Sequence, residues 1–251
     1  MLPPSEGKTS PAETGATIDL QSLMLPGLAA QRSRVMEALA ATSERSDAQE
    51  VLKVGSKVMN DVAANRKLPH APTAPAHRIY TGVLFDALTA DGLTAEQLRL
   101  AGTQVLIFSG LFGVTGFTDR IPAYRCAMDV KLPEVGRLGT FWKQQLAAPL
   151  SERVQDTLVV DCRSSSYAKA FRPPPDQTLA VNNFTQSNGQ RRVVTHFAKA
   201  ARGELTGMLL RSGTEPKSVD DVAHIASQRW RVETRPADTR TPHQLDLIST
   251  S

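Results

Sequence analysis

The spacing of apolar and polar positions predicts helices in the first part of the chain. Val35, Leu39 and Ala40 share one helical face, and a helical pattern continues from about residue 20 to residue 66. Residues 69–75 then hold three prolines, which lack the amide hydrogen that a helix needs. The pattern therefore predicts a helical region over residues 20–66, followed by a connector.

Beyond the connector, apolar runs that end in small polar residues predict buried strands. Residues 105–108 (VLIF) run into a Ser-Gly turn, and residues 157–162 (TLVVDC) run into three serines. The Ser-Asn-Gly sequence at 187–189 predicts a β-hairpin, because Asn-Gly tolerates the positive φ of a tight turn. Residues 196–213 predict an amphipathic helix, and a capping box at 218–221 predicts the start of a last helix.

Together these elements predict an α+β fold, that is, a mixed α/β arrangement with a central sheet flanked by helices. We expect a single domain over residues 1–230. Within it, residues 20–66 are helical and residues 78–230 form a mixed core of sheet and helix. The remainder, residues 234–251, is polar and is expected to be a frayed tail.

The charge balance permits a polyanion as a partner. The 29 lysines and arginines exceed the 25 acidic residues, which gives a net charge of +4 and a pI of about 9.2. Residues 163–213 hold eight basic residues against Asp176 and Glu204, so the rest of the chain sums to −2. The eight are Arg163, Lys169, Arg172, Arg191, Arg192, Lys199, Arg202 and Arg211. The pattern predicts one concentrated basic surface.

The composition also indicates which cell compartment and which cofactors to expect. No apolar run approaches the ~18 residues of a membrane span, and the opening MLPPSEGKTS lacks a secretion signal. We therefore expect a cytoplasmic protein without a membrane partner. Cys126 and Cys162 make no disulfide framework, and no ligand cluster predicts a metal or another cofactor. Because Cys126 follows Arg125, it is either a thiol of lowered pKa or a small buried apolar residue.

Residues 52–66, LKVGSKVMNDVAANR, resemble the second half of a helix-hairpin-helix element. In such an element, backbone amides at Gly55 and Ser56 approach a phosphate, and Lys57 adds charge without reading sequence. Lys53 stands where the usual Gly-x-Gly has its first glycine. A plain helix-turn-helix packing unit is therefore the alternative.

Other polar groups gather where predicted strands end. Serine hydroxyls at 164–166, with Lys169 close behind, can hold a phosphate or a carboxylate, although they can equally cap a helix. Lys199 and Arg202 share one helical face close to the pair Arg191 and Arg192. These cations form either a phosphate-contacting surface or an ordinary solvated face.

Seven segments, in this order along the chain, resemble the YaaA family of peroxide-stress proteins. They are PPSEGKT at 3–9, YTG at 80–82, SGLFGV at 109–114, IPAYRCAMD at 121–129, FWK at 141–143, SSSYAK at 164–169 and HFAKAARG at 196–203. Their order and spacing make the match specific, and the first segment is similar to that of actinobacterial members. Family members usually begin with a hydrophobic strand before the first loop, whereas only Met1 and Leu2 stand there in this chain. Either that strand is missing or the start is assigned too late.

The resemblance implies a cytoplasmic protein of the oxidative-stress response that limits damage from peroxide and iron. It also implies a compact, family-specific fold with a helix-hairpin-helix element, a basic cleft and DNA binding without strong sequence preference. With the patterns above, it predicts a DNA- or phosphate-binding surface of Lys8, Thr9, Gly55, Ser56, Lys57, Arg125, Ser164, Lys169, Arg191, Arg192, Lys199 and Arg202. It further predicts a polar cleft of Ser5, Thr81, Ser109, Tyr124 and Tyr167.

The leading hypothesis is therefore a non-catalytic protein that binds duplex or distorted DNA, with no catalytic residue, no metal and no cofactor. The alternative is an enzyme that uses the same cleft for a small anionic or nucleotide substrate, because nonspecific phosphate contact does not require so many hydroxyl groups. Direct binding of iron is the weakest hypothesis, since the sequence shows no ligand cluster. The sequence leaves the oligomeric state open.

Overall fold

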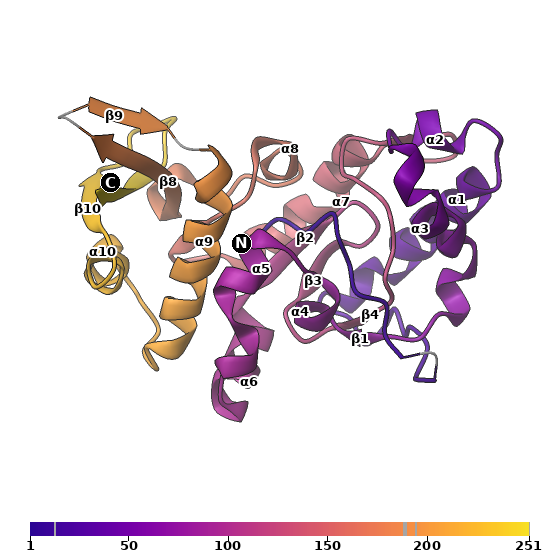
Figure 1. Ribbon diagram of the computed structural model, residues 1–251, viewed down its shortest axis with the longest axis horizontal. Helices are drawn as coiled ribbons and strands as arrows, with labels where there is room; N and C mark the ends of the chain where they lie inside the picture. The colour runs from indigo at the N-terminus through magenta and orange to yellow at the C-terminus, as the bar shows by residue number, and fades with distance from the viewer. Residues whose placement is uncertain (13, 188–189, 194, 251) are drawn as a thin grey trace.

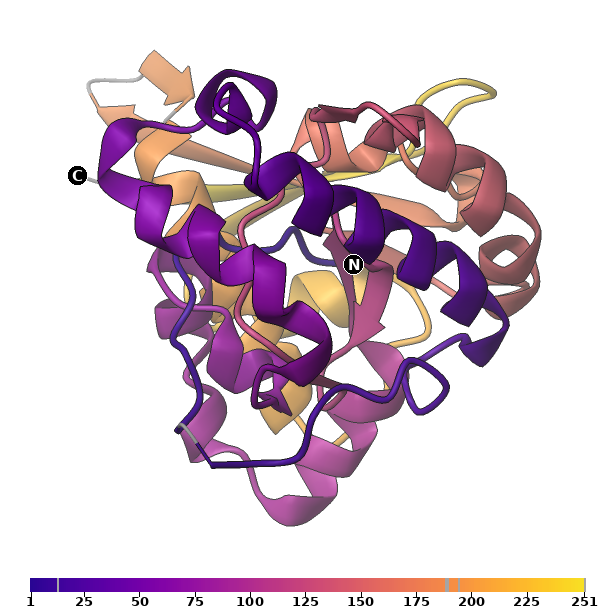
Figure 2. The same ribbon diagram turned by 90° about the vertical axis from the view of Figure 1, so that its right-hand side faces the viewer.

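The structure is a computed structural model that describes residues 1–12, 14–187, 190–193 and 195–250. The helical region expected from the sequence is present in the first part of the chain. Its elements are η1 (Pro26–Leu28), α1 (Ala29–Ser43), α2 (Ala48–Val51), η2 (Ser56–Val58), α3 (Met59–Ala64) and η3 (Asn65–His70). These helices lie at one end of the molecule in Figure 1, and Figure 2 shows them from that end.

The middle of the chain builds the centre of the molecule, with short helices around a two-stranded sheet. Its elements are β1 (Ala74–Pro75), α4 (Ala76–Ile79), α5 (Val83–Leu88), η4 (Ala90–Gly92), α6 (Ala95–Gln104), β2 (Leu106–Ser109), β3 (Gly113–Gly116), β4 (Arg120–Ile121), β5 (Lys131–Leu132), β6 (Gly136–Arg137) and α7 (Leu138–Arg153). Strands β2 and β3 pair antiparallel and are buried along their whole length, as the apolar run at 105–108 predicts.

A five-stranded sheet occupies the other end of the molecule (Figure 1). Its strands follow the order β10-β11-β8-β7, with β9 also paired to β8. The elements of this last part are β7 (Val159–Asp161), α8 (Ser165–Ala168), η5 (Pro175–Gln177), β8 (Thr178–Ser187), β9 (Gln190–Val193), α9 (Thr195–Arg211), α10 (Val219–Ser227), β10 (Arg231–Arg235) and β11 (His243–Thr250). The mixed α+β class is confirmed. Within the described residues, no helix is both long enough and apolar enough to cross a bilayer.

Several local predictions hold. Strands β8 and β9 form the antiparallel hairpin, although residues 188 and 189 of its expected turn lie outside the described residues. The capping box at Ser218 and Asp221 begins α10. Gly213 has the positive φ of +71° expected just beyond the end of α9.

The expectation of a frayed C-terminal tail is wrong. Strand β11 lies between β10 and β8, antiparallel to the first and parallel to the second. Its Leu245 and Leu247 are fully buried, while the intervening Asp246 is buried too and bonds to Asn182 and Arg235. Burial of one apolar face therefore fixes a segment that composition marked as polar.

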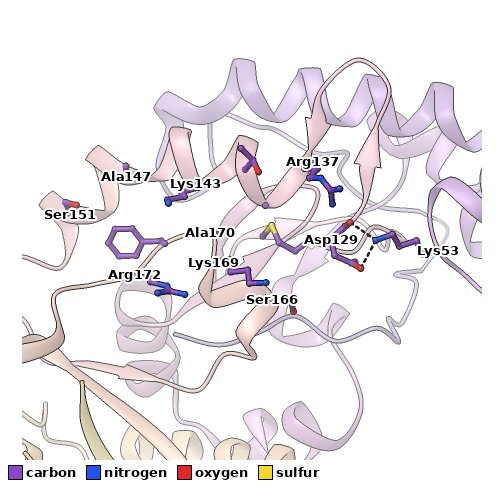
Figure 3. Close-up of a pocket in the computed structure, with 14 residues that line it drawn as sticks. Lys53, Asp129, Arg137, Lys143, Ala147, Ser151, Ser166, Lys169, Ala170 and Arg172 are labelled. Carbon is purple, nitrogen blue, oxygen red and sulfur yellow. Dashed lines mark hydrogen bonds and ion pairs between the residues drawn. The ribbon is translucent and has the colours of Figure 1, made fainter. Parts of the chain in front are cut away.

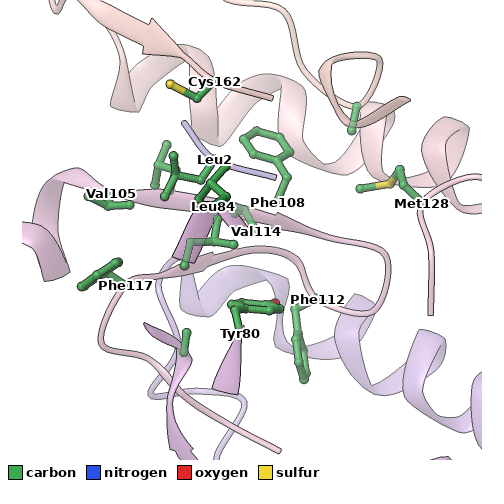
Figure 4. Close-up of a cluster of buried hydrophobic side chains, with 14 of the residues drawn as sticks. Leu2, Tyr80, Leu84, Val105, Phe108, Phe112, Val114, Phe117, Met128 and Cys162 are labelled. Atoms are coloured by element: carbon green, nitrogen blue, oxygen red, sulfur yellow. The ribbon is translucent and has the colours of Figure 1, made fainter. Parts of the chain in front are cut away.

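Met1 and Leu2 lie between β2 and β7, where Leu2 forms an isolated parallel bridge with Ile107. Leu2 bonds to Leu106 O and accepts from Phe108 N, at 2.8 and 3.0 Å. On the other side, the Met1 amine donates to Val160 O at 2.7 Å, and Met1 O accepts from Cys162 N at 3.0 Å. These two residues link the β2–β3 pair to the five-stranded sheet, and Leu2 lies in the apolar cluster beside Phe108 (Figure 4).

A buried guanidinium fixes the loops around β3. Arg32 of α1 is fully buried and donates to four carbonyl oxygens, those of Met24, Leu25, Phe112 and Val114. Burial lowers the pKa of Arg32 to about 10. The bonds hold the helical end of the molecule against the central strands.

Helices α5 and α9 pack closely because α9 presents glycines to α5. A Cβ on Gly203 would collide with the carbonyl of Leu84, and one on Gly207 would collide with the carbonyl of Leu88. The glycine of the HFAKAARG segment therefore has a packing role.

Gly203→Ala should destabilise the protein by about 1–3 kcal/mol, although alanine favours a helix interior by about 1 kcal/mol over glycine. The reason is the collision with α5. Urea denaturation measures the change, and Gly139→Ala in α7 is the matched control, because its nearest neighbour would lie at an ordinary 3.5 Å. Equal or higher stability of Gly203→Ala would contradict this packing.

Candidate functional site

The PPSEGKT loop lies directly on the YTG segment. The Ser5 hydroxyl donates to Gly7 O and accepts from Thr81 N at 3.0 Å. Lys8 and Tyr80 pair as an isolated antiparallel bridge, and Thr9 N donates to Ile79 O at 2.9 Å. The predicted residues Ser5, Lys8 and Thr81 are therefore neighbours, whereas the Thr9 side chain is exposed beside them.

Three buried hydroxyl groups form a chain under this loop. Tyr124 Oη lies 2.9 Å from Tyr80 Oη and 2.7 Å from Ser109 Oγ. Ser109 Oγ also accepts from the amides of Leu111 and Phe112. Burial raises the pKa of Tyr80 to about 12 and raises the pKa of Tyr124 well above its ordinary value, so both hydroxyls stay protonated. Ser109, expected to face a ligand, instead supports Tyr124 from inside the core.

Lys8 rests on the faces of these two tyrosines. Its Nζ lies 4.3 Å from the ring centroid of Tyr124 and 5.4 Å from that of Tyr80. It donates to the carbonyl oxygens of Ser5 at 2.8 Å and Glu6 at 3.4 Å. Burial and then the nearby Arg125 lower the pKa of Lys8 to about 7. The site thus combines an amine of lowered pKa with two tyrosine rings that lie against it.

Arg125 is held beside Lys8 by a residue that sequence reasoning missed. Buried Asn65 of η3 accepts from Arg125 N and donates to Arg125 O, both at 2.9 Å. Arg125 Nη1 donates to Glu6 O at 3.0 Å, and its Nη2 lies 3.5 Å from the Glu6 carboxylate. A lone asparagine at the end of a helical region carries no sequence signal of this role.

Cys126 and Tyr167 belong to the same region, because Cys126 is an electrostatic neighbour of both Lys8 and Tyr167. Burial raises the pKa of the Cys126 thiol to about 12, which excludes the lowered pKa considered from the sequence. Burial raises the pKa of Tyr167 as well, with Tyr80 and Cys126 among its electrostatic neighbours. Ser164 is the N-cap residue of α8, where its hydroxyl lies 3.0 Å from that of Ser166 and caps no backbone amide.

Next to this cluster lies a pocket of about 790 Å³ with a strong excess of positive charge. In Figure 3, Lys143, Lys169 and Arg172 border the same hollow. Lys143 comes from α7, and the other two lie in the short stretch after α8. The lining includes five cationic side chains and a single carboxylate, namely Lys53, Arg137, Lys143, Lys169, Arg172 and Asp129. Of the predicted phosphate-binding residues, only Lys169 lines this pocket.

In the segment that resembles a helix-hairpin-helix element, residues 52–66, the chain turns at the edge of the helical region. Lys53 has a positive φ of +55°, the conformation that the missing glycine would favour. Its Nζ reaches Asp129 at 3.0 Å, at the mouth of the pocket. Gly55, Ser56 and Lys57 are exposed. Their contact with phosphate stays a prediction.

The basic residues of 163–213 do not form one surface, which corrects the expectation from charge counting. Arg163 is buried in an ion pair with Asp161, and Arg202 donates twice to Val181 O. Arg191 pairs with Glu233 on the far sheet, whereas Lys199 is exposed on α9. The Arg192 backbone pairs with that of Thr185, and its side chain lies outside the described part of the structure. Several of these basic side chains already form ion pairs or contacts with carbonyl oxygens. Sequence spacing cannot show such contacts.

The structure thus combines a basic pocket with a polar loop that lies on buried tyrosines. The sequence profile of the family described as "Peroxide stress protein YaaA" matches residues 1–235, and the chain belongs to this family.

Two of the relatives match 90% or more of the chain. A UPF0246 protein of Streptomyces coelicolor is 39% identical over 253 residues, which is 99% of this chain and 97% of that protein. A UPF0246 protein of Corynebacterium efficiens is 38% identical over 90% of both chains. A UPF0246 protein of Flavobacterium johnsoniae is 26% identical over 76% of this chain and 79% of its own length. The resemblance seen in seven segments is thereby confirmed.

Tyr124→Phe should lower the free energy of unfolding by about 1–3 kcal/mol, because it leaves the buried hydroxyls of Tyr80 and Ser109 without their shared partner. Chemical denaturation measures the loss. Ser33→Ala removes an exposed hydroxyl bond to Glu37 and should change stability by less than about 0.5 kcal/mol. Similar small effects of both substitutions would show that the hydroxyl chain is unimportant.

Proposed function

We propose that this protein of the peroxide-stress family binds the DNA backbone through the basic pocket and so limits iron-dependent oxidative damage in the cytoplasm. The observation that carries the proposal is the charge of the pocket. Nonspecific DNA binding needs several cations on one accessible surface, because its affinity comes from phosphate neutralisation.

Four of the five cations of the pocket are exposed and, in the part of the chain that the structure describes, have no partner. Within the described residues, Arg137, Lys143, Lys169 and Arg172 make no ion pair and no side-chain hydrogen bond. The one carboxylate in the lining, Asp129, is already paired with Lys53. Like charges that gather without compensation repel each other, and a row of phosphates relieves that repulsion.

The turn that follows Lys53 extends this surface. Lys53 begins the turn that carries Gly55, Ser56 and Lys57, so these exposed groups follow directly from the mouth of the pocket. Exposed backbone amides and a lysine can contact phosphates without reading bases. Lys199 of α9 offers a further exposed cation.

Phosphate neutralisation also supplies a physical route to protection from iron. DNA holds a layer of condensed counterions, and a protein that neutralises phosphates releases them. Iron(II) bound at the backbone is among the ions displaced, and hydroxyl radicals from its reaction with peroxide then form away from the DNA. This mechanism requires no iron site in the protein.

Replacing Lys143, Lys169 and Arg172 together by glutamine should weaken binding of unrelated duplexes and make it less sensitive to salt. Each lost phosphate contact lowers the slope of log K against log[salt] by about 0.9. Fluorescence anisotropy over a salt series measures both effects, and Arg99→Gln on the exposed face of α6 is the matched control. Unchanged slope and affinity in the folded triple variant would rule out this pocket as the DNA site.

A further inference from the structure

DNA binding at the basic pocket does not explain why Lys8 is held on the rings of Tyr80 and Tyr124. Lys8 Nζ donates only to two backbone carbonyls, and among the described residues no carboxylate forms an ion pair with it. A cation that neutralises phosphate needs neither burial nor an aromatic floor. The placement is that of an amine whose charge is disfavoured.

Burial and Arg125 lower the pKa of Lys8 to about 7, so a large part of its amine is unprotonated at neutral pH. Only the unprotonated form carries the lone pair that attacks a carbonyl carbon. Desolvation and a neighbouring cation are the two means by which proteins activate lysine as a nucleophile. Both are present at Lys8.

Lys8 and Arg125 converge on one point. Lys8 Nζ and Arg125 Nη1 donate to the same atom, Glu6 O, at 3.4 and 3.0 Å. The Asn65 amide fixes the backbone of Arg125 on the far side. An amine and a guanidinium that share one acceptor can contact adjacent groups of one small molecule.

The Glu6 carboxylate lies where Arg125 can pair with an anion. It lies 3.5 Å from Arg125 Nη2, yet the Glu6 side chain is 88% exposed. An exposed ion pair of this kind contributes little to stability, so an incoming anion displaces the carboxylate at small cost. The Arg125 side chain is only 19% exposed and stays in place.

We propose that Lys8 forms an imine with a small aldehyde or ketone whose neighbouring carboxylate or phosphate is held by Arg125. The Lys8 lone pair attacks the carbonyl carbon, the N–C bond forms, and the C–O π electrons move to oxygen. The two protons of the amine pass to that oxygen through solvent, water leaves, and a C=N bond remains. The step needs no oxidant or reductant, and it is independent of DNA binding.

The tyrosines position the amine and do not transfer its protons. Their ring faces, not their hydroxyls, lie against Lys8 Nζ, and the hydroxyls bond to each other and to Ser109. The rings exclude water from one side of the amine and leave its other side open, since Lys8 is only half-buried. Tyr80 and Tyr124 are thus positioning residues.

Reductive trapping tests the proposal on the full-length protein. Glyoxylate carries an aldehyde next to a carboxylate, and cyanoborohydride reduces its imine to a stable secondary amine. At neutral pH and low glyoxylate, peptide mass mapping should show at least about tenfold faster labelling of Lys8 than of the other lysines, in line with a pKa lower by more than one unit. Labelling of Lys8 no faster than of the exposed Lys57 or Lys199 would overturn the proposal.

Acetaldehyde distinguishes anion binding by Arg125 from the reactivity of the Lys8 amine itself. It has no carboxylate, so the preference for Lys8 over other lysines should be smaller with acetaldehyde than with glyoxylate, and only the part that comes from the lowered pKa should remain. Arg125→Gln should lower labelling by glyoxylate more than labelling by acetaldehyde, because it removes the contact with the carboxylate as well as one cause of the lowered pKa. Equal preference for both aldehydes in the wild-type protein would refute the role of Arg125. DNA affinity measured on the same Arg125→Gln protein distinguishes this result from a failure of the proposed DNA binding.

Discussion

The backbone pairing of Met1 and Leu2 is the interaction on which the rest of the structure depends. Their bonds to Leu106, Phe108, Val160 and Cys162 join the β2–β3 pair to the five-stranded sheet. The same two residues begin the loop that reaches Tyr80 at Lys8. Because backbone groups buried in a sheet must find partners, this pairing fixes the course of the loop as well as the union of the sheets.

From this constraint the two polar regions of the molecule follow. The loop brings Lys8 onto Tyr80 and Tyr124, while the segment after Tyr124 carries Arg125 inward to Asn65 and Asp129 outward to the basic pocket. Two regions of different electrostatic character therefore meet within a short stretch of chain. One side holds an amine in surroundings that disfavour its charge, and the other side exposes uncompensated cations that suit a polyanion.

Periodicity predicted the elements with clear apolar patterns, namely the early helices, strand β2, the β8–β9 hairpin and the capped helix α10. It missed β11, because Asp246 inside that strand is stabilised by Arg235 from a neighbouring strand, a contact that local pattern cannot show. The family resemblance named Ser5, Lys8, Thr81 and Tyr124, which the fold does bring together. Neither approach found Asn65, and charge counting placed Arg163 on a surface although it is buried.

Lys8 is held on Tyr80 and Tyr124 as an amine that loses its proton near neutral pH. A titration of ¹³C-labelled lysine side chains by NMR tests it most directly, with the Lys8 signal assigned by its loss in Lys8→Gln. We expect a midpoint for Lys8 at about pH 7, against the ordinary value of 10.5. A Lys8 signal that titrates near 10.5 would contradict the claim.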